Sequence, residues 1–136
     1  MSASPSVSEK RLSKIGDALV LQVDAPSRLV TVVFEDDGDT GYFYALAPTA
    51  DGELELLDAL HAYNAEADLR GADVQLEIVW SADSRLAGLR INASLWALFD
   101  FAAETGWTRS EFPPPAGRWK MAGKRPPWTD ELVRAL

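Results

Sequence analysis

The sequence contains no cysteine and only one histidine, His61, and these two scarcities exclude several kinds of chemistry. Without cysteine the chain has no thiol nucleophile, no thiolate-bound metal and no disulfide bond. With one histidine it cannot build a zinc site from two or three histidines of its own. We therefore predict neither a metal site nor a cofactor.

Long hydrophobic runs are missing as well. No apolar run approaches the roughly 18 residues that a membrane-spanning helix needs. Residues 1–15 also lack the apolar core of a secretory signal. We therefore expect a cytoplasmic protein without a membrane partner.

The 136 residues carry 21 acidic and 13 basic side chains, a net charge of −8 that is unevenly spread. Residues 1–104 have a net charge of −11, whereas residues 105–136 have a net charge of +3. Because nucleic-acid binding depends on neutralising phosphates, the acidic body argues against a nucleic-acid partner. We expect the basic end, which is rich in tryptophan, to fold back onto the acidic body.

The length of the chain corresponds to one domain. Residues 1–14 are poor in apolar side chains and predict a disordered leader, and residues 15–136 predict a single folded domain. Alternating apolar residues and β-branched runs predict six strands, over residues 18–24, 28–35, 40–46, 74–81, 85–92 and 95–101. Short turns between the last three strands indicate an antiparallel sheet.

Leucines at helical spacing predict one main helix over residues 53–66. Residues 107–128 hold three tryptophans and five prolines, and predict an irregular tail that wraps the domain. Thr129 is typical of a helix N-cap and predicts a short C-terminal helix over residues 130–136. The predicted fold class is therefore α+β: a mostly antiparallel five- or six-stranded sheet with one main helix, a Pro/Trp-rich wrapping tail and a short C-terminal helix.

Five short blocks, in their order along the chain, resemble a small bacterial family catalogued as domain of unknown function 2251. The blocks are GYFYAL (41–46), LDALHAYN (57–64), VWSAD (79–83), ALFDFAA (97–103) and FPPP (112–115). The resemblance extends over residues 14–115. It departs from the family pattern at Ala47, where an acidic residue is common, and at residues 92–94, where an Asn-Gly turn is common. Since the family has no assigned active site, the resemblance implies a bacterial intracellular protein and no activity.

His61 is the first candidate for catalysis, because an imidazole titrates near neutral pH and can act as an acid or a base. On a helix, Asp58 would lie on the same face three residues away, so the two side chains would form a dyad. The alternative is a surface or half-buried histidine that is hydrogen-bonded to a neighbour and takes no part in catalysis.

An acidic cluster at the tip of a predicted hairpin is the second candidate site. Asp36, Asp37 and Asp39 follow Glu35 there. The cluster does not match the EF-hand calcium loop, because Gly38 stands where an oxygen ligand is needed. We interpret it as a solvated turn, with a contact surface for a basic protein partner as the functional alternative.

Aromatic side chains are more numerous than one small core requires. Four of them are candidates for lining a ligand pocket or an interface: Tyr42, Tyr44, Tyr63 and Trp80. Trp96 alternates with the inward residues of its predicted strand, so a helix, the tail or another subunit must cover it. The same meander carries polar residues that are most simply members of cross-strand ion pairs, with a polar groove on the open face as the functional alternative: Glu77, Asp83, Arg85, Arg90 and Asp100.

Two functional hypotheses follow from these observations. The leading one is a non-enzymatic, acidic protein-interaction module that binds a protein partner or a second copy of itself as a homodimer. One version of it is an immunity-like or antitoxin-like protein that masks a basic effector. The alternative is a small-ligand-binding protein, or a hydrolase or isomerase, with a pocket centred on His61.

Overall fold

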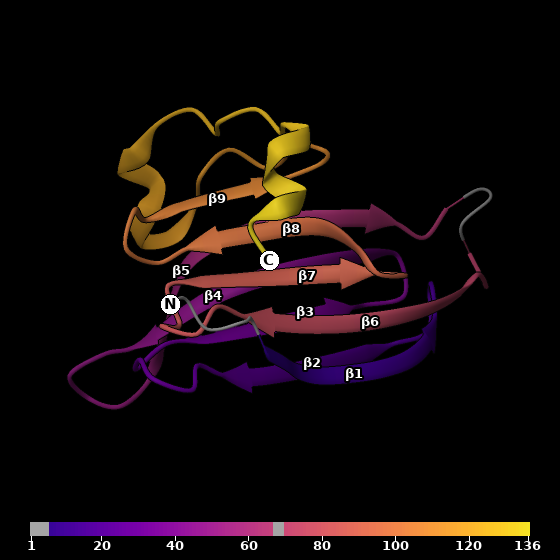
Figure 1. Cartoon of the computed structure of the whole chain (residues 1–136), viewed down its shortest axis with the longest axis horizontal. Helices are drawn as coiled ribbons and strands as arrows, with labels where there is room; N and C mark the ends of the chain where they lie inside the picture. Colours follow the sequence, from indigo (N-terminus) through magenta and orange to yellow (C-terminus); the bar gives the residue numbers. More distant parts are fainter. Residues whose placement is uncertain (1–5, 67–69) are drawn as a thin grey trace.

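The computed structural model describes residues 6–66 and 70–136 and shows two antiparallel β-sheets packed face to face (Figure 1). The five-stranded sheet has the order β1-β6-β7-β8-β9, with the bounds Ser6–Lys14, Asp73–Trp80, Leu86–Ile91, Ser94–Asp100 and Thr105–Thr108. The four-stranded sheet has the order β2-β3-β4-β5, with the bounds Leu19–Asp24, Thr31–Asp36, Thr40–Pro48 and Leu54–Asn64. Two short 3-10 helices follow, η2 (Gly117–Ala122) and η3 (Asp130–Arg134).

The predicted α+β fold class is wrong, because the described residues form two β-sheets and contain no α-helix. The main helix expected over residues 53–66 is strand β5, which pairs with β4. The pairing shifts twice, between Ala45 and Leu46 and between Gly41 and Tyr42, so β5 holds an extra residue at each place. Each extra residue interrupts the two-residue alternation of the strand. The buried leucines of β5 therefore take a spacing that resembles that of a helix.

Both ends of the chain also differ from expectation. Residues 6–14, expected to lie in a disordered leader, form strand β1 and pair with β6. Residues 1–5 lie outside the described residues. The C-terminal helix expected over residues 130–136 is only the 3-10 turn η3, and Thr129 forms no side-chain cap hydrogen bond with it.

The hydrophobic core lies between the two sheets. Phe43 of the four-stranded sheet and Phe99 of the five-stranded sheet meet there, with 5.1 Å between their ring centroids. The alternation predicted for β6 and β7 is confirmed, since Leu76, Ile78 and Leu89 are among the largest fully buried side chains. The side chains between them in the sequence therefore belong to the outer face of the sheet.

The segment after β9 packs on the outside of the sandwich (Figure 1, orange to yellow). It runs along β5, where the backbone N–H of His61 donates to the carbonyl of Phe112 at 2.9 Å. It then crosses the outer face of the five-stranded sheet, where Leu136 lies over Gly88 of β7. A Cβ at Gly88 would be 2.7 Å from the Cδ1 of Leu136, so the glycine makes room for the end of the chain. No helix among the residues that the structure describes is long and apolar enough to span a membrane.

Candidate functional site

The outer face of the four-stranded sheet carries a row of side chains that crosses all four strands. The register places Glu35 of β3 opposite Val20 of β2 and Tyr42 of β4, and it places Tyr42 opposite His61 of β5. These residues alternate with the core residues of their strands, so they share the face that points away from the core. Val20 is 61% exposed and the other three are half-buried. Solvent therefore reaches the whole row.

His61 is held firmly within this row. Its Nδ1 lies 3.0 Å from Ser110 Oγ, and its Nε2 lies 3.0 Å from Asn64 Oδ1. Both ring nitrogens of His61 therefore have a hydrogen-bonding partner. The ring also packs edge-on against Tyr42 and Phe112, with centroids 5.5 and 6.1 Å away.

The structure separates Asp58 from His61. The proposed dyad required a helix, whereas on the strand Asp58 turns inward and is 1% exposed. Its two carboxylate oxygens each accept a hydrogen bond of 2.9 Å from the guanidinium of Arg125. The remaining N–H groups of Arg125 donate to the backbone carbonyls of Ala59, Gly106 and Pro113. Asp58 is thus half of a buried ion pair that fastens the tail to β5 and β9, and it is not available as a base.

The acidic tip divides into a buried and an exposed part. Asp36, expected in a solvated turn, is 2% exposed and accepts hydrogen bonds from the Tyr63 hydroxyl at 2.6 Å and the Gly16 N–H at 2.8 Å. The pKa of Tyr63 is raised, mainly by burial and then by this hydrogen bond to Asp36. Tyr63 therefore lies in the core and does not line a pocket with His61.

The exposed part of the tip consists of Asp37 and Asp39. Asp37 accepts from the backbone N–H groups of Asp39 and Thr40, and these hydrogen bonds hold its pKa below the usual value. Asp39 lies 3.6 Å from the guanidinium of Arg70. Among the described residues no group of three or more His, Asp or Glu side chains is arranged to hold a metal ion.

The two candidate tryptophans are both covered. Trp80 is fully buried and stacks on Phe101, with 5.6 Å between ring centroids, so it belongs to the core. The guanidinium of Arg109 lies 4.8 Å from the centroid of Trp96 and 5.8 Å from that of Trp128. Of the three covers considered for Trp96, the structure therefore shows the tail.

Cross-strand ion pairs were expected among the polar residues of the meander, and the structure shows which residues pair. The Nε and Nη2 of Arg85 donate to the carboxylate of Asp100 at 2.8 to 3.1 Å, and Arg90 lies 3.9 Å from Glu77. Burial alone would raise the pKa of Asp100. The hydrogen bonds from Arg85 and from the N–H groups of Ala102 and Ala103 outweigh that effect, so the pKa lies below its usual value.

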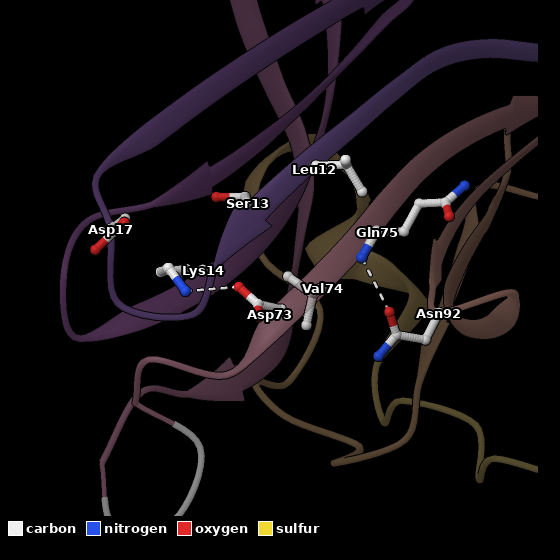
Figure 2. A pocket seen from close by; sticks show the side chains of 8 residues that line it. All are labelled: Leu12, Ser13, Lys14, Asp17, Asp73, Val74, Gln75 and Asn92. Atoms are coloured by element: carbon white, nitrogen blue, oxygen red, sulfur yellow. Dashed lines mark hydrogen bonds and ion pairs between the residues drawn. The ribbon is translucent and has the colours of Figure 1, made fainter.

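A hollow of about 590 Å³ lies beside β1 and β6, away from the row described above. Its lining has three charged residues, and Figure 2 shows two of them, Lys14 and Asp73, paired with each other at 2.6 Å; Asp17 is the third. Figure 2 also shows Asn92, whose side-chain oxygen accepts from the backbone N–H of Gln75 at 2.9 Å. Three of its lining residues, Lys14, Asp73 and Asn92, thus already have partners within the chain.

The negative charge is concentrated in the segment that forms the four-stranded sheet. Residues 15–66, which contain β2 to β5, hold eleven acidic residues and one basic residue, Arg28. The remainder of the chain holds ten acidic and twelve basic residues. The Nε of Arg28 donates to the carbonyl of Asp83, at the turn between β6 and β7. The sequence shows this uneven distribution of charge when residues 15–66 are counted separately, whereas a division at residue 104 hides it.

Comparison with known proteins gives a family but no function. The model of a family described as an uncharacterized protein conserved in bacteria, DUF2251, matches residues 13–136. An uncharacterized protein of Haemophilus influenzae is 40% identical over 85 residues, which are 62% of this chain and 52% of that protein. The chain thus matches about half the length of this relative. No solved structure matches the chain. The resemblance noted in the sequence is confirmed, and the chain belongs to the bacterial DUF2251 family.

Proposed function

We propose that this DUF2251 protein is a non-enzymatic, acidic protein-interaction module whose binding surface is the outer face of the four-stranded sheet. The observation that carries the proposal is the row of Glu35, Tyr42 and His61 on a face open to solvent. This row lies within a segment that holds eleven acidic residues and one basic residue. We call this surface the acidic face.

The chemistry of the acidic face favours a basic protein as its partner. Tyrosine is enriched at the energetically important centres of protein interfaces, because it combines a large apolar ring with a hydroxyl. Carboxylates around such a centre attract a cationic partner and accelerate its association. Two copies of this face would repel each other, as would the phosphates of a nucleic acid. An immunity-like or antitoxin-like role, masking a basic effector, is the specific form of this proposal.

Capture followed by measurement with a purified partner tests the proposal. The immobilised full chain is exposed to a bacterial lysate, each retained protein is purified, and its affinity is measured for the wild type and two variants. Glu35→Lys reverses a charge on the acidic face. Glu131→Lys makes the same change on η3, outside the acidic face.

A purified partner is expected to be basic and to bind less tightly as salt rises. Its affinity should fall about tenfold or more with Glu35→Lys, because like charges are then brought together, and should stay unchanged with Glu131→Lys. A partner that binds all three proteins equally, or that is acidic, would contradict the proposal.

One observation favours a hydrolase as a second candidate function. Ser110, His61 and Asn64 form a chain of hydrogen-bonding contacts in the order that a nucleophile, a base and an orienting amide would take. Ser110 Oγ also lies 3.2 Å from the carbonyl of His61, so a purely structural role satisfies the same atoms. Labelling by a fluorophosphonate separates the two roles. Covalent modification of Ser110 that is lost in His61→Ala would support the hydrolase. If the wild-type protein is not modified at Ser110, the hydrolase is excluded.

A further inference from the structure

Two tyrosines stand side by side at the centre of the acidic face. Tyr42 and Tyr44 are two residues apart on β4, with their ring centroids 5.8 Å apart and their planes within 14° of each other. Both are half-buried, so each ring leaves part of its surface accessible. The two rings therefore form a small aromatic platform on the open side of the sheet.

A carboxylate without a counter-ion lies next to this platform. Glu35 is directly opposite Tyr42 in the register, and Val33, two residues away, is opposite Tyr44. Glu35 forms no ion pair with any residue that the structure describes. Burial raises the pKa of Tyr44, and the negative charge of Glu35 raises it further.

Elsewhere the chain itself places an arginine on aromatic rings. The guanidinium of Arg109 lies 4.8 Å from the ring centroid of Trp96 in β8 and 5.8 Å from that of Trp128 in the tail. On the four-stranded sheet the aromatic platform and the carboxylate are present, but the chain supplies no cation. The single basic residue of that segment, Arg28, makes its hydrogen bond to the turn between β6 and β7 instead.

We propose that Tyr42, Tyr44 and Glu35 form a subsite for an arginine side chain of the partner. The proposal rests on the function proposed above and names the chemistry of its contact. The guanidinium lies flat against a tyrosine ring while its N–H groups donate to the carboxylate of Glu35. Arginine suits this subsite better than lysine, because its charge is planar, more weakly hydrated and able to donate two parallel hydrogen bonds.

Three synthetic peptides of equal length test the subsite on the full chain: a glycine–arginine repeat, a glycine–lysine repeat and a glycine–citrulline repeat. Citrulline keeps the planar shape of arginine without its charge. Calorimetric titration at low salt is expected to show the arginine peptide binding about two- to fivefold more tightly than the lysine peptide. The citrulline peptide should not bind measurably, because it lacks the charge that Glu35 and its neighbours attract.

Variants assign the preference to individual side chains. Tyr42→Leu and Tyr44→Leu should remove the preference for arginine while leaving the binding of the lysine peptide nearly unchanged. Glu35→Gln should weaken both peptides. Two control variants elsewhere, Trp107→Leu of β9 and Glu131→Gln of η3, should change neither. If a tyrosine variant fails to fold, the comparison of the three peptides on the wild type still decides the matter.

The outcomes separate the subsite from the function on which it rests. Equal binding of the arginine and lysine peptides, both weakened by Glu35→Gln, would overturn the arginine subsite and leave the acidic face standing. Absence of binding by either cationic peptide would overturn both. Tight binding of the citrulline peptide would show that charge plays no part, and would also overturn both.

Discussion

The two sheets of this protein are built alike but are covered differently. On the outer face of the five-stranded sheet, Val79 and Leu98 are only 1% and 2% exposed, since the C-terminal segment packs over that sheet. On the outer face of the four-stranded sheet, Val20 is 61% exposed and Tyr42 and Tyr44 are half-buried. The chain therefore covers the outer face of the five-stranded sheet with its own tail and leaves the acidic face open.

The same contrast appears in the charges. The segment that contains the four-stranded sheet holds eleven acidic residues and one basic residue, whereas the rest of the chain is close to neutral. In the rest of the chain Arg85 pairs with Asp100 and Lys14 with Asp73. Three further basic residues of that part pair with acidic residues of the segment, Arg70 with Asp39, Arg118 with Glu55 and Arg125 with Asp58. The segment that contains the open face therefore carries the net negative charge of the chain.

The largest effect is expected from breaking the ion pair that fastens the tail. Arg125→Met leaves the carboxylate of Asp58 buried without its partner, and should lower the free energy of unfolding by about 3–5 kcal/mol, measured by urea denaturation. The double variant Asp58→Leu with Arg125→Met should recover much of this loss. The exposed pair of Arg118 and Glu55 is the matched control, and Arg118→Met should have only a small effect. An equal loss of unfolding free energy for Arg125→Met and Arg118→Met would contradict the expected difference between the buried and the exposed ion pair.

A matched pair of truncations tests the two outer faces directly. Leu98→Ala, under the tail, should lower the free energy of unfolding by about 2–5 kcal/mol, because it leaves a cavity. Val20→Ala, on the acidic face, should change it by no more than about 0.5 kcal/mol. Denaturant titration of the two variants gives the comparison. Similar losses would mean that both faces are covered in solution.

A glycine in the tail gives the next effect. Gly117 has a φ of 64°, and a Cβ there would press on the backbone carbonyls of Leu56 and Leu57 in β5. Gly117→Ala should therefore destabilise the protein by about 1–3 kcal/mol and loosen the tail. Gly52→Ala is the control, since Gly52 also has a positive φ but has no atom within 4 Å of the added Cβ. Gly117→Ala should unfold at a lower temperature and be cleaved faster in limited proteolysis than Gly52→Ala. Equal behaviour of the two variants would show that the contact between Gly117 and β5 does not affect stability.

The smallest expected effect depends on pH. The pKa of Asp100 lies below its usual value in the folded protein, so its ion pair with Arg85 stabilises the fold at neutral pH. That contribution is present above the unfolded-state pKa of about 3.9 and is lost as the pH falls through the lower folded-state pKa. Asp100→Asn should therefore be less stable than the wild type at pH 7, with a difference that shrinks in acid. A difference in urea midpoints that stays constant with pH would contradict this.

Regular alternation made part of the fold predictable from the sequence. The three strands over residues 74–101 and most of their inward rows follow from a two-residue period with short turns. Leu95, which that period places inward, instead lies opposite Arg90 and beside Gly88 on the outer face, because the pairing of β7 and β8 shifts between Leu89 and Arg90. The same period places Tyr42 and Tyr44 on one face. Strand β5 was not predictable in this way, because its two bulges break the period.

The misassigned strand also limited what could be said of the candidate site. A helix put His61 beside Asp58, whereas the strand puts it beside Tyr42 and Phe112. The partner of Asp58, Arg125, is 67 residues further along the chain, and no local pattern marks a buried arginine in a basic tail. Long-range pairs of this kind become visible only when the sheets are assembled.

The most direct test of the central claim is a map of backbone amide chemical shifts in the isotope-labelled full chain as the glycine–arginine peptide is added. The open acidic face predicts shifts that cluster at Glu35, Tyr42, Tyr44 and their neighbours on β3 to β5, with β7 and β8 unchanged. Shifts centred on β7 and β8, or spread evenly over both sheets, would contradict it.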